Sequence, residues 1–283
     1  MRALFLPGED NFPSCATREK ENNFTMATWS SGQYLKFANE RTQPSIDLVA
    51  RIAIEAPMRI IDLGCGPGNS TAVLARRWPR AALTGLDNSP AMLAAARQSH
   101  PTWTWREHSI AEWAQENTEV FDVVFSNAAL HWVPDHATLL PRLFAAVAPG
   151  GALAFQMPHS LRDPHQRLMR ELAASAVWRS RFTQPPVTWQ VEPAAIYYDL
   201  LAPLATRIEL WFTDYVFVFE GPEQIVEWHR GAALPPFLEA LPDEATRAEF
   251  LRDYLAAITP HYPRRPDGKV LQPFRRFFAI AYR

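Results

Sequence analysis

The sequence predicts an α/β fold: a doubly wound, mostly parallel sheet with helices on both faces. Strand-like and helix-like segments alternate from about residue 58 to residue 155, which is the rhythm of strand–helix–strand units. Glycine is scarce, with 11 in the chain, yet Gly64, Gly66 and Gly68 stand directly between a buried strand and a helix. Doubly wound sheets bind nucleotide-type ligands at such turns.

Each element follows from hydrophobic spacing or from a capping residue. Ser89 followed by Pro90 predicts the start of a helix that runs to Ser99. Apolar residues at helical spacing predict further helices over 44–56, 69–78, 134–147, 163–180 and 222–258. Apolar runs predict strands over 58–63, 81–86, 102–105, 121–125, 151–155, 208–212, 216–219 and 277–282. A turn is expected near Asp214, between the sixth and seventh of these strands.

The pattern divides the chain into an extension and one large domain. Residues 1–25 have no hydrophobic periodicity, which predicts a flexible N-terminal extension, with a start codon assigned too early as the alternative. Residues 26–283 form the domain. Its helical insertions, roughly 159–206 and 222–262, are expected to cap the carboxyl edge of the sheet.

Composition excludes several function classes. The net charge of -2, from 28 basic and 30 acidic residues, argues against a nucleic-acid binder that neutralises phosphates. Cys15 and Cys65 make no disulfide framework. Because no apolar run reaches the ~18 residues of a membrane span, and no signal-peptide core occurs, we expect a cytoplasmic protein without a membrane partner. The oligomeric state stays open.

The residues around the glycine turn distinguish between ligand classes. Counted from Gly64 and Gly66, the last glycine of a dinucleotide fingerprint is replaced by Asn69. Asp62 before the turn suits a ligand that carries an ammonium and a sulfonium. Asp87, after the next strand, can accept both ribose hydroxyls. The pattern favours S-adenosylmethionine, while a nicotinamide-dependent oxidoreductase and a purely structural turn remain alternatives.

Asp62-Leu63-Gly64-Cys65-Gly66-Pro67-Gly68 with Asp87 resembles the first motif and the acidic second-strand position of class I S-adenosylmethionine-dependent methyltransferases. From Met26 onward the chain also resembles trans-aconitate 2-methyltransferases, at Trp29, Tyr34, Phe37, Arg41, Pro44, 127–136, 156–158 and 197–199. The resemblance implies a seven-stranded Rossmann-like sheet with a helical substrate cap. It also implies methyl esterification of one carboxylate of a small polycarboxylic acid, most simply trans-aconitate.

The resemblance also assigns the cofactor to residues at the ends of successive strands. They are Asp62, Gly64, Cys65, Gly66, Gly68, Asn69, Asp87, Asn88, Met92, Ser109, Ile110 and Asn127. Ser109-Ile110 stands where the family has an Asp-hydrophobic pair facing adenine, and the serine hydroxyl can still hydrogen bond the adenine amine. For Cys65 a packing role is the alternative to a reactive thiol.

Cationic and phenolic side chains are the candidates for holding the acid substrate. They are Tyr34, Arg41, Tyr197, Tyr198 and Arg276, with Trp132 as a wall of the methyl site. For the tyrosines packing is the alternative, and for the arginines a solvated or ion-paired surface position. Gln43 and Pro235 replace arginines of the resembling family, which makes a dicarboxylate or monocarboxylate substrate plausible as well.

The acceptor decides whether a catalytic base is needed. A carboxylate has a pKa near 4 and is ionised at pH 7, so its methylation requires alignment and exclusion of water, without metal or covalent intermediate. The sequence assigns no certain catalytic residue, and His131 and Trp132 are the candidates. His131 would act as a base if the acceptor were instead a hydroxyl, an amine or a carbon acid.

Overall fold

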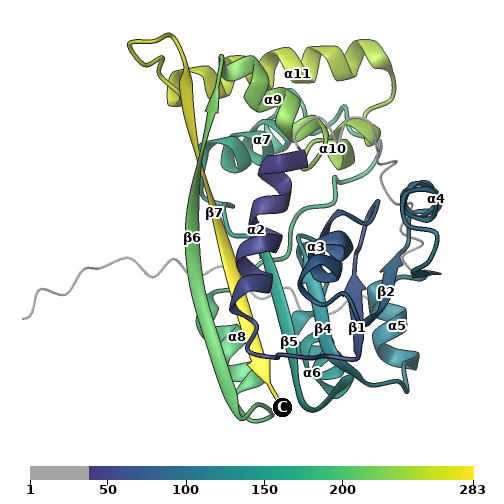
Figure 1. The fold of residues 1–283 in the computed structure, drawn as a ribbon. Coiled ribbons are helices and arrows are strands. Elements are labelled where there is room, and N and C mark those ends of the chain that lie inside the picture. Colours follow the sequence, from purple (N-terminus) through teal and green to yellow (C-terminus); the bar gives the residue numbers. More distant parts are fainter. Residues whose placement is uncertain (1–37) are drawn as a thin grey trace, which may run out of the picture.

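The computed structural model describes residues 38–283, and the side chains from Thr42 onward. The predicted extension 1–25, Tyr34 and the side chain of Arg41 lie outside the described part. A seven-stranded sheet in the order β3-β2-β1-β4-β5-β7-β6 forms the centre of the molecule (Figure 1). Neighbouring strands are parallel except at β7, which runs antiparallel to both β5 and β6. The predicted fold class is confirmed.

The strands are β1 (Arg59–Leu63), β2 (Ala82–Asp87), β3 (Thr104–Glu107), β4 (Phe121–Asn127), β5 (Val147–Pro158), β6 (Arg207–Phe219) and β7 (Val270–Tyr282). The α-helices are α2 (Ala38–Arg51), α3 (Asn69–Arg77), α4 (Pro90–Ser99), α5 (Ile110–Glu116), α6 (His136–Ala145), α7 (Pro164–Ala174), α8 (Ala194–Leu201), α9 (Pro222–Arg230), α10 (Pro235–Glu239) and α11 (Glu244–Ile258). Short 3-10 helices are η1 (Leu130–Trp132) and η2 (Thr259–His261).

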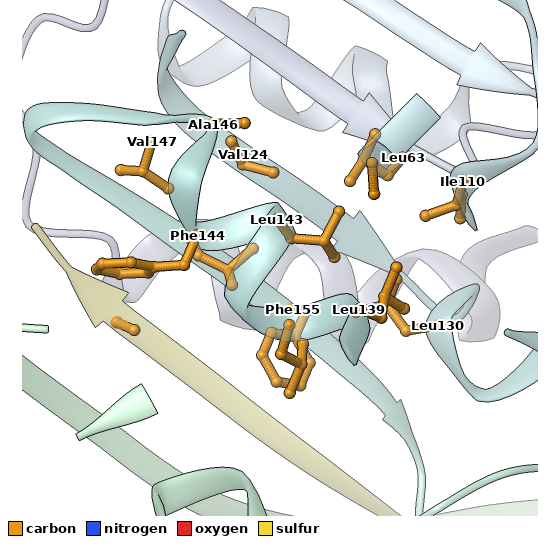
Figure 2. Packing of buried hydrophobic residues seen from close by; sticks show 14 of the residues in the cluster. Leu63, Ile110, Val124, Leu130, Leu139, Leu143, Phe144, Ala146, Val147 and Phe155 are labelled. Carbon is orange, nitrogen blue, oxygen red and sulfur yellow. The ribbon is translucent and has the colours of Figure 1, made fainter. Parts of the chain in front are cut away.

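Helices cover both faces of the sheet. On one face, apolar residues of α2 and α3 join inward residues of β1, β4, β5 and β7 in one buried cluster. On the other face, α5, α6 and α8 pack in a second cluster. Figure 2 shows part of it, with Leu139 and Leu143 of α6 close to Val124 of β4 and Phe155 of β5. This two-sided burial explains why β1 and β4 read as continuous apolar runs.

A third apolar cluster lies beyond the carboxyl edge of the sheet. It joins α7, α9, α10 and α11 with the far ends of β6 and β7, which extend into this group of helices (Figure 1). We call these four helices the upper helices. Helix α8, which the predicted insertion 159–206 also contains, packs instead on the sheet face against α6, with Tyr197 and Leu201 buried.

The predicted turn near Asp214 is wrong, because β6 runs through it without interruption. Asp214 pairs with Arg275 of β7 in the antiparallel ladder, and their side chains form an ion pair at 3.9 Å. Aspartate is unfavourable in strands, but a cross-strand arginine at an exposed edge offsets that preference. The ladder also lengthens the last strand, which begins at Val270 instead of 277.

Several helix boundaries differ from the prediction as well. Helix α2 spans 38–51 instead of 44–56, and the Arg77 guanidinium binds the carbonyls of Val49 and Ile52 at its end. The single helix predicted over 222–258 is three helices, because Gly231 ends α9 and Asp243 caps α11. Helix α7 ends at Ala174 instead of 180, and the short helices α5 and α8 were not predicted.

Candidate active site

The glycine turn connects β1 to α3 at the carboxyl end of the sheet. The backbone N–H groups of Gly64 and Cys65 both donate to the Leu86 carbonyl, at 2.7 and 3.0 Å, which ties the turn to β2. Gly64, Gly66 and Gly68 all have positive φ, at 72°, 55° and 94°. A side chain is disfavoured there, so the scarce glycines are placed where the backbone requires them.

Asp62 is fully buried beneath this turn. Its Oδ2 accepts hydrogen bonds from Ser70 Oγ at 2.7 Å and Thr71 Oγ1 at 2.6 Å, both from the first turn of α3. Its Oδ1 is buried without a partner among the described residues. Burial raises the pKa of Asp62 to about 6, against the lowering effect of the two hydroxyls. The carboxylate therefore has one oxygen held by two hydroxyls and one buried oxygen without a partner in the described structure.

Asp87 lies at the end of β2, next to the same turn. Its Oδ2 accepts the Gly66 N–H at 2.8 Å and its Oδ1 accepts the Ser89 N–H at 2.9 Å. Burial raises its pKa, and these backbone donors oppose the shift. Ser89 in turn caps α4 through the Met92 N–H, as predicted. Asp62 thus binds the first turn of α3, and Asp87 binds the glycine turn itself.

Gly64 is also the point of closest approach between the turn and η1. A Cβ at Gly64 would stand 2.2 Å from the Ala129 Cβ and 3.6 Å from the Ile110 Cδ1. At Gly66 a Cβ would meet nothing within 4 Å. Gly64 therefore allows the segment after β4 to pack directly on the turn, and that segment carries His131 and Trp132.

Ser109 is the N-cap of α5. Its hydroxyl accepts the Glu112 N–H at 3.1 Å and donates to Glu112 Oε2 at 2.8 Å. The predicted Ser109-Ile110 pair thus lies at the helix start, with Ile110 buried against the glycine turn. One acceptor position remains on the serine oxygen for an adenine amine.

Cys65 is a packing residue rather than a reactive thiol. Its side chain is buried, and its Sγ lies 3.6 Å from the Gly66 carbonyl. Burial, with the nearby charges of Asp62 and Asp87, raises the pKa of the thiol far above its ordinary value. A neutral thiol of this kind is a poor nucleophile.

A chain of hydrogen bonds runs from β4 across β5 to β7. Gln156 Nε2 donates to Asn127 Oδ1 at 2.5 Å, and Arg276 Nη1 donates to Gln156 Oε1 at 3.0 Å. The predicted cofactor residue Asn127 and the predicted substrate residue Arg276 are thereby joined. Arg276 is 5% exposed, so its charge is held inside the protein. Gln156 was not assigned to the site from sequence, although it lies in one of the segments that resemble the family.

His131 is buried beside two tryptophans. Its ring lies 5.0 Å from Trp132 and 4.9 Å, edge-on, from Trp189, and its Nδ1 has no partner among the described residues. Burial lowers its pKa well below the ordinary value, and the charges of Arg276 and His136 lower it further. The imidazole is therefore neutral near pH 7. A base of such low pKa is poorly matched to deprotonating a hydroxyl or an amine.

Tyr197 and Tyr198, two of the predicted substrate residues, lie on α8, and their hydroxyls are not placed beside Arg276. The Tyr197 hydroxyl is buried and already bound, to the Glu192 N–H at 2.9 Å and His136 Nδ1 at 2.9 Å. The neighbouring Tyr198 is 52% exposed. Since α8 packs on the sheet face, the structure does not bring these hydroxyls together with Arg276.

The two positions that depart from the resembling family lie on separate elements. Gln43 Nε2 donates to Asp47 Oδ1 at 2.8 Å along the surface of α2. Pro235 is the first residue of α10.

A methyltransferase domain family matches residues 60–151 of this chain. Trans-aconitate 2-methyltransferase of Methylobacterium radiotolerans is 48% identical over 260 residues, which cover 90% of this chain and 98% of the relative. The protein of that name from Azoarcus sp. is 46% identical over 258 residues, 91% and 100% of the two chains. The chain belongs to the trans-aconitate 2-methyltransferase family. It is a methyltransferase that uses S-adenosylmethionine, and membership of this family excludes the nicotinamide alternative.

Solved structures share the fold at low identity. The YcgJ protein from Bacillus subtilis has a TM-score of 0.56 at 13% identity, covering 85% of this chain and 98% of that one. Phosphoethanolamine N-methyltransferase 2 of Haemonchus contortus has a TM-score of 0.51 at 17% identity, covering 84% and 52%. Within residues 38–283, no helix is long and apolar enough to cross a membrane, and no group of three His, Cys, Asp or Glu side chains is arranged to hold a metal ion.

The glycine turn fits S-adenosylmethionine on the observations above. The unpartnered Asp62 Oδ1 suits an ammonium, and the open space at Gly66 leaves the backbone of the turn accessible. Sequence reasoning did not assign Ser70 and Thr71, although hydroxyls in the first turn of the following helix are a readable signal for holding such a carboxylate.

We expect Asp62→Asn to raise stability while weakening the cofactor site. The pKa of Asp62 is about 6 when folded and 3.8 when unfolded, so the folded chain binds more protons between these values and its stability falls as pH rises through them. Above pH 6 the variant gains up to about 3 kcal/mol at ~1.4 kcal/mol per pKa unit. Thermal midpoints from pH 4 to pH 8 measure this.

Calorimetry with S-adenosylhomocysteine measures the second half of the prediction. In the native chain affinity should fall below pH 6 as Asp62 takes up a proton, and in Asp62→Asn it should be weak throughout. Asp163→Asn is the matched control. Burial also raises the pKa of Asp163 to about 6, but this residue is the N-cap of α7 and does not belong to the proposed cofactor site. Equal affinity in Asp62→Asn and the native chain would contradict the assigned role.

Proposed function

We propose that this enzyme transfers the methyl group of S-adenosylmethionine to one carboxylate of trans-aconitate, giving a monomethyl ester. The observation that carries the proposal is similarity over nearly the whole length of relatives with that name, at 46% to 48% identity. A buried arginine, Arg276, supports it, because Gln156 joins it to Asn127 at the end of β4 and an anionic substrate requires a positive charge in its site.

The cofactor would be held between β1, β2 and β4. Asp62 Oδ1 would take the ammonium of the methionine part, the glycine turn would lie against that part, and Asp87 would accept the ribose hydroxyls. Asn88, Met92, Ser109 and Ile110 would border the adenine. Gly68 and Asn69 begin α3, whose N-terminal N–H groups favour the methionine carboxylate.

The acid would be held on the β7 side. Arg276 donates one N–H of its planar guanidinium to Gln156 and carries the positive charge that a carboxylate requires. Trp132 and His131 form an apolar, neutral wall. Arg41 and Tyr34 remain proposed substrate residues from the sequence alone.

When bound, S-adenosylmethionine supplies an electrophilic methyl group: a carboxylate oxygen forms the new bond to carbon while the carbon–sulfur electron pair returns to sulfur. The chain has no proton to remove, since the acceptor is already ionised at pH 7. Its side chains align the acceptor and exclude water, and alignment of this kind contributes roughly 7–11 kcal/mol in favourable cases. The depressed pKa of His131 is consistent with a reaction that needs no base.

The test is an acid panel. Purified protein is incubated with S-adenosylmethionine and trans-aconitate, related dicarboxylates and monocarboxylates, and methyl esters are measured by mass. We expect the highest kcat/KM with trans-aconitate, and a rate that does not rise through pH 6 to 7 in the manner of a histidine base. Absence of ester with every acid would sink the proposal.

A further inference from the structure

A small crevice lies where the upper helices meet η1. Its lining includes Trp132, Leu161, Gln166, Arg170, Trp189 and Phe237, and none of its lining side chains in the described part is acidic. The crevice is therefore a neutral-to-positive site at the carboxyl edge of the sheet, and the proposed methyl transfer does not yet use it.

Two lining side chains have buried donors without acceptors. Gln166 is 3% exposed and Trp189 is 7% exposed, yet Gln166 Nε2 and Trp189 Nε1 have no hydrogen-bond partner among the described residues. Leaving a buried N–H unpaired is costly, and such groups are rare in folded proteins. Both donors belong to side chains that line one crevice, and a ligand bound there would supply the missing acceptor.

Arg170 adds positive charge at the same place. Its Nε donates to the Gln166 carbonyl at 3.3 Å, and its Nη2 binds the Leu161 carbonyl. These contacts fix the guanidinium along α7 and hold the backbone of Gln166. A carboxylate is the chemical group that accepts from amide and indole N–H donors and also pairs with a guanidinium.

The crevice is joined to the proposed methyl site through aromatic contacts. The Trp189 ring lies 6.1 Å from Trp132 and 4.9 Å from His131. His131 is close enough to Arg276 for that charge to lower its pKa. The crevice and Arg276 are therefore both near His131.

We propose that this crevice binds a carboxylate of the substrate other than the one that is methylated, through Gln166 Nε2, Trp189 Nε1 and the charge of Arg170. The inference rests on the proposed function and adds a specificity site to it. Gln166 and Trp189 select acids that carry a second carboxylate, while Arg276 serves the reacting end.

The test compares Gln166→Leu and Trp189→Phe with the native enzyme on trans-aconitate and on an unsaturated monocarboxylic acid of similar chain length. Loss of a hydrogen bond to a charged group predicts a rise in KM for trans-aconitate of about 10- to 100-fold in each variant. The KM for the monocarboxylate and the affinity for S-adenosylhomocysteine should not change. Gln190→Leu is the control, since Gln190 is the exposed neighbour of Trp189.

Thermal unfolding distinguishes a KM change caused by a lost substrate contact from one caused by a less stable fold. Since Gln166 Nε2 has no partner in the described structure, Gln166→Leu should keep or raise the melting temperature. An unchanged KM for trans-aconitate, or an equal rise with both acids together with a lower melting temperature, would overturn the inference and leave the proposed function standing. If the native enzyme esterifies no acid at all, the proposed function fails and this site with it.

Discussion

Gly64→Ala should weaken the binding of S-adenosylhomocysteine by more than about 100-fold. Gly64 has φ 72°, and an added Cβ would stand 2.2 Å from the Ala129 Cβ. Overpacking of this kind costs roughly 1–3 kcal/mol, and the left-handed backbone adds about 1–2 kcal/mol for a residue with a side chain. The turn and η1 must then separate, which moves the backbone that faces the cofactor. Calorimetry and the thermal midpoint measure both effects.

Gly66→Ala is the matched control for this prediction. Its φ of 55° imposes similar backbone strain, but its Cβ would meet nothing within 4 Å. We expect a modest stability loss there. Ala129→Gly in the Gly64→Ala background should recover part of the affinity, because it removes the opposing Cβ. If Gly64→Ala and Gly66→Ala lose the same affinity for S-adenosylhomocysteine, backbone strain is the cause of the loss, and the contact with Ala129 is not.

Arg276→Met should lower kcat/KM for the acid substrate by about 10²- to 10⁴-fold, mainly through KM. Truncating one partner of a buried charge pair costs about 2–5 kcal/mol, at ~1.4 kcal/mol per tenfold. Arg276→Lys keeps the charge but loses the planar fork that serves Gln156 and a carboxylate together, so it should recover only part of the activity. Steady-state kinetics with varied acid at saturating cofactor measures kcat and KM separately.

Arg275→Met controls for loss of positive charge on β7. Arg275 is the neighbouring residue, with its side chain half-exposed and paired to Asp214, so its removal should leave KM within about twofold. A second readout follows His131 by NMR. Its pKa should rise in Arg276→Met but stay below the ordinary value, because burial is the larger cause. An unchanged KM in Arg276→Met would remove this residue from the substrate site.

The cofactor half of the site could be predicted from local sequence. Asp62, the three glycines and Asp87 lie within one strand–turn–helix–strand unit, and parallel strands bring their carboxyl ends to one edge. The substrate half could not be predicted in this way. Tyr197 and Tyr198 lie in a segment that resembles the family, yet the partners of the Tyr197 hydroxyl, His136 and Glu192, depend on how α8 packs.

The sequence by itself determined the alternation of strands and helices, the glycine turn and the cap at Ser89, because short-range periodicity and backbone geometry act over a few residues. Only the tertiary structure decided the rest. Asp214 continues a strand because Arg275 lies across from it. Gln166 and Trp189 reach one crevice because distant segments fold over the sheet edge. Such contacts are set by packing between residues far apart in the chain, which no local pattern encodes.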